Sequence, residues 1–279
     1  MARITRSEVE RRIQRRDPMR NLDLTGLNLE DLVMVGVDMR FSNLADCNLN
    51  GVNLSGSMLE RCSFNDCELL DASFQEASLV SCQMERASFR NANLVEANFR
   101  EAEMQQATFR GANLDGALLI KVNAPLADFS NTSMFNARLD ESVLTLCDFT
   151  ACDSGNLIAA KADFSGSVMT GIKMDRSNFK GANMSFCDLS GAFLRGCQME
   201  EINFFATVLR DAHLTKSNLA QAHFMNTFAE SAKINGANLK GANLIDADFT
   251  SSNFDSSFMM ETMESRTVFE NVSFQNTRR

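Results

Sequence analysis

Large apolar residues recur at every fifth position along almost the whole chain. From Leu24 to Phe274, all but five of these positions carry Leu, Phe, Met or Ile, and no insertion shifts the phase. The five exceptions are Ala124, Ser154, Ala159, Ala229 and Glu264. A period of five fits neither the roughly 3.6 residues of a helical turn nor the two-residue alternation of a plain strand. The pattern therefore predicts a chain that turns every five residues.

A second column of residues lies two positions before each large apolar residue, and it holds small or modest side chains. Between residues 72 and 112 this column contains only Ala and one Cys. Of the 14 Gly residues, 13 lie two positions after a large apolar residue, Gly26 and Gly111 among them. Gly is favoured where a turn needs a positive φ. The turns are therefore part of the repeat itself.

The segments Ala112-Asn-Leu-Asp-Gly, Ala182-Asn-Met-Ser-Phe and Ala237-Asn-Leu-Lys-Gly closely resemble the repeats of the pentapeptide-repeat proteins. The resemblance covers residues 22–277. It implies an all-β fold, a right-handed quadrilateral β-helix with four pentapeptides per coil. In such a fold the large residue and the small residue two positions before it point inward. Residues 1–21 are then expected to form an N-terminal segment with a short capping helix.

Residues 7–16 carry the pattern of that helix. Ser7 and Glu10 have the spacing of a capping box, while Val9 and Ile13 fall on one side. We interpret the helix as a lid over the first coil, because solenoids need their ends covered. Alternatively, the outer side of the helix is a patch of Arg side chains that docks a partner. The helix can act as a lid and as a docking patch at the same time. The patch would consist of Arg11, Arg12, Arg15 and Arg16.

Composition and charge narrow the class of protein. Of the 279 residues 44% are hydrophobic, yet no apolar run approaches the roughly 20 residues that cross a bilayer. The N-terminus lacks the apolar stretch of a secretory signal. We therefore expect a cytoplasmic protein that does not enter a membrane. The net charge of −9 argues against direct nucleic-acid binding, which favours a basic stripe, and allows an acidic surface that meets a basic partner.

All eight cysteines fall in the small column, and we expect them to be buried free thiols. They are Cys47, Cys62, Cys67, Cys82, Cys147, Cys152, Cys187 and Cys197. Cys47 and Cys67 would stack one coil apart, within disulfide range, but a cytosolic chain keeps its thiols reduced. No Cys-x-x-Cys pair and no catalytic motif occurs. We therefore expect no metal, no cofactor and no enzymatic activity, and we interpret His213 and His223 as surface residues.

With 20 residues per coil, the residue number assigns each outward position to one of four faces. The face centred on Leu29, Leu49 and Leu69 carries eleven acidic residues against three Arg, and we call it the acidic face. Its candidate residues are Asp128, Asp148, Asp188, Asp211, Glu230 and Asp248. The face centred on Met39 and Leu59 balances eight acids with eight bases, which is typical of a solvated surface.

The face centred on Leu144 and Phe164 has almost no outward charge between Asp163 and Asp246. Several coils of exposed apolar residues favour an interaction site. Pro125 keeps an alternative open, in which the chain distorts locally and some of these residues turn inward. We call the apolar residues the apolar stripe; they are Leu126, Leu146, Phe186, Phe205, Met225 and Ile245.

Two functions are consistent with these surfaces. The first is a scaffold or adaptor that binds a protein partner along the apolar stripe or the acidic face. The second follows from the resemblance, because some pentapeptide-repeat proteins are acidic dimers that occupy the DNA site of gyrase or topoisomerase IV. The repeat runs to the end of the sequence without a lid. Phe269 and Phe274 therefore predict a homodimer through the C-terminal coil.

Overall fold

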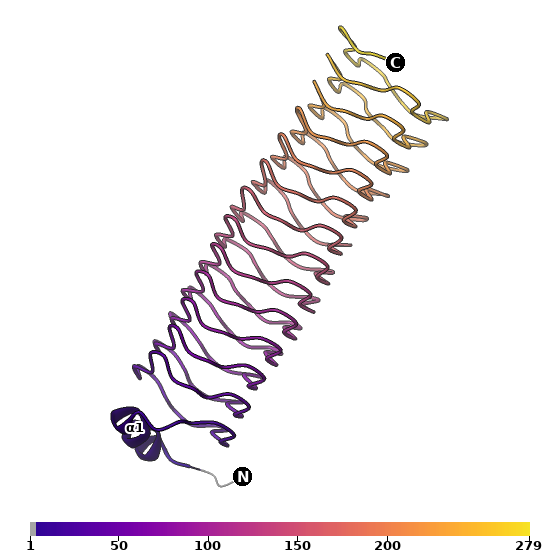
Figure 1. Cartoon of the computed structure of the whole chain (residues 1–279). Helices are drawn as coiled ribbons and strands as arrows, with labels where there is room; N and C mark the ends of the chain where they lie inside the picture. Colours follow the sequence, from indigo (N-terminus) through magenta and orange to yellow (C-terminus); the bar gives the residue numbers. More distant parts are fainter. Residues whose placement is uncertain (1–3) are drawn as a thin grey trace. The chain divides into compact units, whose positions relative to one another are not determined.

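The computed structural model describes residues 4–279, which divide between Arg138 and Leu139 into two compact units. We call them the first unit and the second unit. One helix, α1 (Arg6–Arg15), precedes the repeats, and the described residues after it form turns and isolated parallel β-bridges. Each unit is a right-handed quadrilateral β-helix, whose stacked coils Figure 1 shows.

One coil takes 20 residues in both units. Every bridge joins residues 20 positions apart, such as Asn43 with Ser63, and each bridged residue directly precedes a position of the five-residue phase. Between coils, the Leu44 N–H donates to the Ser63 carbonyl oxygen over 2.8 Å. Within a coil, the Cys47 N–H donates to the Leu44 carbonyl oxygen over 3.1 Å and closes the turn. Four such turns make each coil square.

Each turn holds one residue in the left-handed conformation, two positions after the large inward residue. Gly111 has a φ of 72° there, and Asn91 has a φ of 55° at the equivalent position one coil earlier. Gly111 also leaves space, because a Cβ atom on it would lie 2.6 Å from the Asn91 Oδ1. The turns that the Gly pattern predicts are therefore present.

The two inward columns form the core of each unit. In the first unit the rings of Phe89 and Phe109 stack with centroids 5.1 Å apart. In the second unit Phe204 and Phe224 lie 5.2 Å apart. The small column leaves room for these rings, and several of its hydroxyl groups donate to backbone carbonyl oxygens of the preceding coil. The Ser57 hydroxyl, for example, donates to the Met34 carbonyl oxygen over 3.0 Å.

All eight cysteines are buried thiols, which confirms the expectation from their column. The Cys67 Sγ–H donates to the Leu44 carbonyl oxygen over 2.9 Å. Burial raises the pKa of Cys62, Cys187 and Cys197 to about 12. These thiols therefore remain protonated at neutral pH, and they fill the small column as Ser and Ala do.

The start of α1 differs from the sequence prediction. Thr5 is the N-cap, and its hydroxyl accepts a hydrogen bond from the Glu8 N–H over 3.4 Å. The capping box predicted at Ser7 and Glu10 is therefore wrong. Glu10 instead accepts a hydrogen bond from Arg6 Nε over 2.9 Å. Both Thr5 and Ser7 are good capping residues, so the contacts of the helix with the first coil decide between them.

Contacts with the first coil fix α1 in place. Val9 is buried, and the Arg6 guanidinium donates to the carbonyl oxygens of Asn28 and Glu30 over 3.2 and 3.1 Å. The repeat phase reaches back to Met19, which is also buried. The helix therefore covers part of the first coil, as the interpretation as a lid requires.

Candidate interaction surfaces

Five residues of the apolar stripe belong to the second unit, and none of them is in the core. Leu146 and Phe186 are 60% and 62% exposed. Phe205, Met225 and Ile245 are half-buried. The rings of Phe186 and Phe205 meet edge to face with centroids 5.4 Å apart. The five side chains therefore stay on the outer surface of their coils.

The regular turns determine how far these side chains project. Leu146 and Phe186 occupy the left-handed turn position, with φ of 57° and 60°. Phe205, Met225 and Ile245 directly follow a large inward residue, where side chains lie closer to the coil. The turn residues Leu146 and Phe186 are therefore the most exposed side chains of the stripe in the second unit.

Leu126, the sixth residue of the stripe, belongs to the first unit and is 52% exposed. The repeat is regular at this point, because Ala124 is buried and the Gln106 N–H donates to the Pro125 carbonyl oxygen over 3.0 Å. Pro125 directly follows Ala124, and at this position of the described repeats the backbone N–H makes no backbone hydrogen bond to another coil. The missing N–H of Pro therefore removes no such bond. The chain therefore does not turn Leu126 inward.

The carboxylates of the acidic face have a structural role in the turns. Asp148 and Asp248 each accept a hydrogen bond from the backbone N–H two residues later, over 2.8 Å. Asp128 and Asp188 do the same over 2.8 and 3.0 Å. Asn183, on another face, makes the same contact over 3.1 Å. These Asp residues therefore act as turn acceptors in the way that Asn does elsewhere.

The acidic face of the second unit is also interrupted. Glu230 accepts a hydrogen bond from Arg210 Nε over 3.1 Å, while Asp211 is exposed. Apolar residues alternate with acids in the bridged column of this face. The column contains, in order, Asp148, Val168, Asp188, Val208, Phe228 and Asp248. Negative charge on this face is therefore discontinuous.

A basic band, which is not among the surfaces predicted from the sequence, runs along the face of the second unit centred on Met174 and Leu194. Its members share outward positions on adjacent coils: Lys173, Arg176, Phe193, Arg195, His213, Lys216 and Lys233. The sequence contains the signal for this band, because in a coil of 20 residues the residue number places each of these side chains on the same face.

Ring contacts organise the centre of the basic band. Phe193 and His213 lie with ring centroids 4.8 Å apart, and the Arg195 guanidinium lies 5.5 Å from the Phe193 centroid. Lys233 Nζ is 3.3 Å from His213 Nε2. Burial, together with the charges of Lys233 and Arg195, lowers the pKa of His213. The imidazole is therefore neutral at pH 7, and the positive charge of the band comes from Lys and Arg. Asp175, on the same face, pairs with Arg195 over 2.5 Å and offsets one of these charges.

The C-terminal coil is less open than the sequence suggests. Phe269 and Phe274 are half-buried, and their ring centroids lie 5.4 Å apart. The Arg279 guanidinium lies 4.7 Å from the Phe274 centroid and pairs with Glu264 over 2.5 Å. Arg279 thus covers part of the aromatic surface, and Glu264 holds it there.

Within residues 4–279, no group of three or more His, Cys, Asp or Glu side chains is placed to hold a metal ion. None of the described helices has the length and apolar character needed to span a bilayer.

Comparisons with known proteins agree with the repeat geometry. A family model described as pentapeptide repeats (8 copies) matches residues 19–56, 112–150, 160–196, 202–241 and 230–262. A second, described as a pentapeptide repeat region, matches residues 57–129. No match was found among curated protein sequences.

Similar solved structures include HetL, a pentapeptide repeat protein involved in heterocyst differentiation regulation from the cyanobacterium Nostoc sp. strain PCC 7120. It is 18% identical, with 98% of each chain covered and a TM-score of 0.30. QnrB1, a plasmid-mediated fluoroquinolone resistance protein, is 17% identical over 92% of this chain and 90% of its own, with a TM-score of 0.37. The 20-residue coils and the family matches over more than half of the sequence show that this chain belongs to the pentapeptide-repeat family.

Proposed function

We propose that this protein is a non-enzymatic scaffold that binds a protein partner along the apolar stripe of its second unit. The exposure of Leu146 and Phe186, at 60% and 62%, carries the proposal. Both lie on a face with almost no charge between Asp163 and Asp246. Apolar residues that line up over several coils mark an interaction surface, whereas scattered ones do not.

Polar groups beside the stripe support the same function. The Asn203 side-chain amide donates to Asn183 Oδ1, and the Asn183 amide donates to Asp163 Oδ1, each over 3.0 Å. An apolar centre next to ordered hydrogen-bonding groups is the usual composition of a protein interface. Because bonds between coils hold the backbone, ordering this surface on binding costs little entropy.

Site-specific photo-crosslinking in the native host tests the proposal. A benzoylphenylalanine residue in place of Phe186 should crosslink a protein partner, and Leu146→Asp in the same chain should abolish the product. The matched control carries the photo-reactive residue in place of Phe228, which is exposed on the acidic face of the same unit. Equal products from both positions, or none from position 186, would contradict the proposal.

DNA mimicry is the second candidate, and it would use the acidic face. The interruptions at Val168, Val208 and Phe228 favour the scaffold over it, because the phosphates of DNA form a continuous series of charges. A mimic should inhibit gyrase supercoiling at micromolar concentration. Changing Asp128, Asp148 and Asp188 together to Lys should remove that inhibition. A wild-type protein without effect on gyrase would exclude this function.

A further inference from the structure

Within residues 4–279, no complete coil precedes the first coil, and other groups cover parts of its edge. The Arg6 guanidinium donates to the carbonyl oxygens of Asn28 and Glu30 on one face. On another face, the Met19 N–H donates to the Asp38 carbonyl oxygen over 2.9 Å. The Arg6 contacts replace the hydrogen bonds that a preceding coil supplies elsewhere, whereas the Met19 bond is the regular bond between coils, equivalent to that from the Met39 N–H to the Met58 carbonyl oxygen.

The edge at Val33 and Val35 has no such cover. Within residues 4–279, the backbone N–H and carbonyl groups of these two residues make no hydrogen bond, and Val33 forms a bridge only with Asn53 of the next coil. Their side chains are 65% and 58% exposed. Soluble proteins usually protect a β-edge with charged residues, Pro or a covering element. This edge instead presents two β-branched apolar residues, which favour strand pairing.

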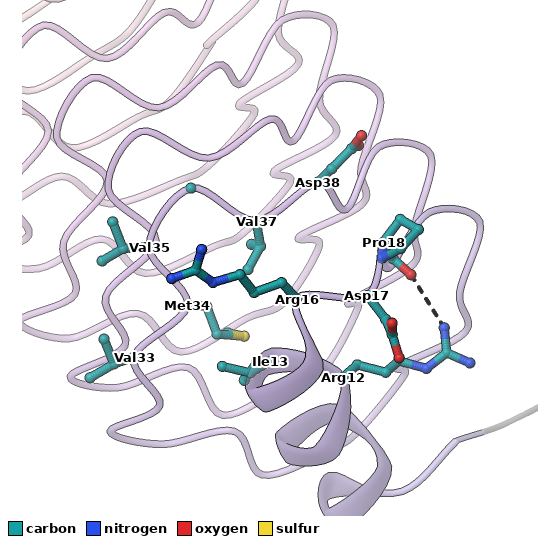
Figure 2. Close-up of a pocket in the computed structure, with 11 residues that line it drawn as sticks. Arg12, Ile13, Arg16, Asp17, Pro18, Val33, Met34, Val35, Val37 and Asp38 are labelled. Carbon is teal, nitrogen blue, oxygen red and sulfur yellow. Dashed lines mark hydrogen bonds between the residues drawn. The ribbon is translucent and has the colours of Figure 1, made fainter.

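Helix α1 makes this edge one wall of a groove (Figure 2). The cavity has a volume of about 450 Å³. Ile13 and Arg16 line it from the helix side, and Val33, Val35 and Val37 line it from the coil. Figure 2 shows the Arg16 side chain extending from the end of α1 toward Val35. The groove therefore combines an unpaired backbone edge, an apolar surface and a guanidinium group.

Arg16 supplies the charge that is open to a ligand. Arg12, the other cation of the groove, already donates to Glu8 over 2.9 Å and to the Pro18 carbonyl oxygen over 3.3 Å. Within the part of the chain that the structure describes, Arg16 has no ion pair. Asp17 lies on the side of Arg12 and Pro18, away from Val35 (Figure 2). Asp38, the other acid that lines the groove, is already paired with Arg20 and Arg40. The part of the groove beside Val35 is therefore positively charged.

We propose that this groove binds an extended, acidic segment of another protein by strand addition to Val33–Val35. The hydrogen bonds between existing coils define the pairing: Met34 N–H donates to Asn53 O over 2.7 Å, and Asn53 N–H donates to Leu32 O over 2.9 Å. By the same pattern, the bound segment donates to the carbonyl oxygens of Val33 and Val35 and accepts from the Val33 N–H. One of its carboxylates pairs with Arg16.

The chemistry of the edge selects a polypeptide. Alternating donors and acceptors at strand spacing are a property of the peptide backbone, and a nucleic acid or a fatty acid does not supply them. Charge disfavours a second copy of this chain, because symmetric pairing of two such edges places Arg16 near the partner copy's Arg16. The site lies in the first unit, so it is separate from the five residues of the apolar stripe that belong to the second.

Fluorescence anisotropy with the full-length protein tests the charge. The probe is a fluorescein-labelled eight-residue peptide of alternating Val and Asp, and the control peptide alternates Val and Lys. We expect saturable binding of the acidic peptide only. Arg16→Glu should weaken it by about tenfold or more, because reversal replaces attraction with repulsion. Arg15→Glu is the matched control, since Arg15 is exposed and does not line the groove, and it should change affinity less than about twofold.

Hydrogen exchange tests the strand pairing. At saturating peptide, the Val33 amide should exchange with solvent at least about tenfold more slowly than in the free protein. N-methylation of alternate peptide residues should remove both this protection and binding. Val33→Asp should abolish binding, whereas Val168→Asp, at an equivalent exposed position of the second unit, should not. Unchanged affinity in Arg16→Glu or an unprotected Val33 amide would overturn the proposal. A peptide-independent dimer that Val33→Asp dissociates would assign the edge to a second copy instead.

Discussion

The first and second units have the same interior but differently arranged surfaces. Phe rings in contact with one another fill both cores. Opposite outward charges pair in both units, as Arg86 does with Asp66 over 2.7 Å in the first and Arg210 does with Glu230 over 3.1 Å in the second. In the second unit, the basic band, the acidic face and the apolar stripe occupy separate faces. The inward columns therefore determine the fold, and the outward columns vary without disturbing it.

Removal of a core ring should produce the largest effect, and a similar one in each unit. Phe99 and Phe179 are fully buried at equivalent positions. Phe99→Ala and Phe179→Ala should each lower the free energy of unfolding by about 3–5 kcal/mol, because a cavity adds to the lost burial. Denaturant-induced unfolding followed by circular dichroism measures this loss.

The outward control is Phe186→Ala, which should change the free energy of unfolding by no more than about 0.5 kcal/mol. A loss comparable to that of Phe179→Ala would mean that the stripe contributes to the core, and the distinction between inward and outward columns would fail.

Thiol reactivity compares the two cores by a second measurement. Cys62 belongs to the first unit and Cys197 to the second, and burial raises the pKa of both to about 12. At pH 8 the thiolate fraction is then about a thousandfold below that of a thiol of pKa 9. A thiol reagent should label almost no native cysteine and all eight after denaturation. Rapid native labelling confined to one unit would show that its coils open separately.

The sequence predicts the interior well, because a constant phase of five assigns every residue to an inward or outward column. The burial of all eight cysteines follows from that phase alone. The start of α1 was not predictable, since Arg6 must first meet the carbonyl oxygens of Asn28 and Glu30. The open edge at Val33 was not predictable either, because it depends on which face the helix leaves uncovered.

The sequence predicts surfaces less completely. The residue number alone brings Leu146 and Phe186 to one face, and the structure exposes both. The same numbering does not reveal that the turns use Asp148 as a backbone acceptor, or that Arg279 covers Phe274. Such contacts depend on side-chain reach across neighbouring coils, so a count of charges per face overestimates the charge that is available to a partner.

Substitution at the C-terminal coil of the second unit should have a smaller energetic effect than substitution in the core. We predict that the half-buried rings of Phe269 and Phe274 pair two copies of the chain, because burying such a side chain contributes on the order of 2 kcal/mol. Phe274→Asp should convert a dimer to a monomer in sedimentation velocity. Phe258→Asp, at an exposed outward position of the same unit, is the control. A wild-type monomer at tens of micromolar, or a dimer that survives Phe274→Asp, would contradict the prediction.

The smallest effect concerns the support beneath the apolar stripe. Gly166 has a φ of 71°, and a Cβ atom there would lie 2.7 Å from Leu146 Cδ2. Gly171, in the same unit, has a φ of 64° and no atom within 4 Å of that position. Both substitutions to Ala place a side chain in the left-handed region, at a cost of about 1–2 kcal/mol. Only Gly166→Ala also displaces Leu146, so it alone should reduce crosslinking from position 186. Equal crosslinking yields in the two variants would show that the orientation of Leu146 does not matter for the partner.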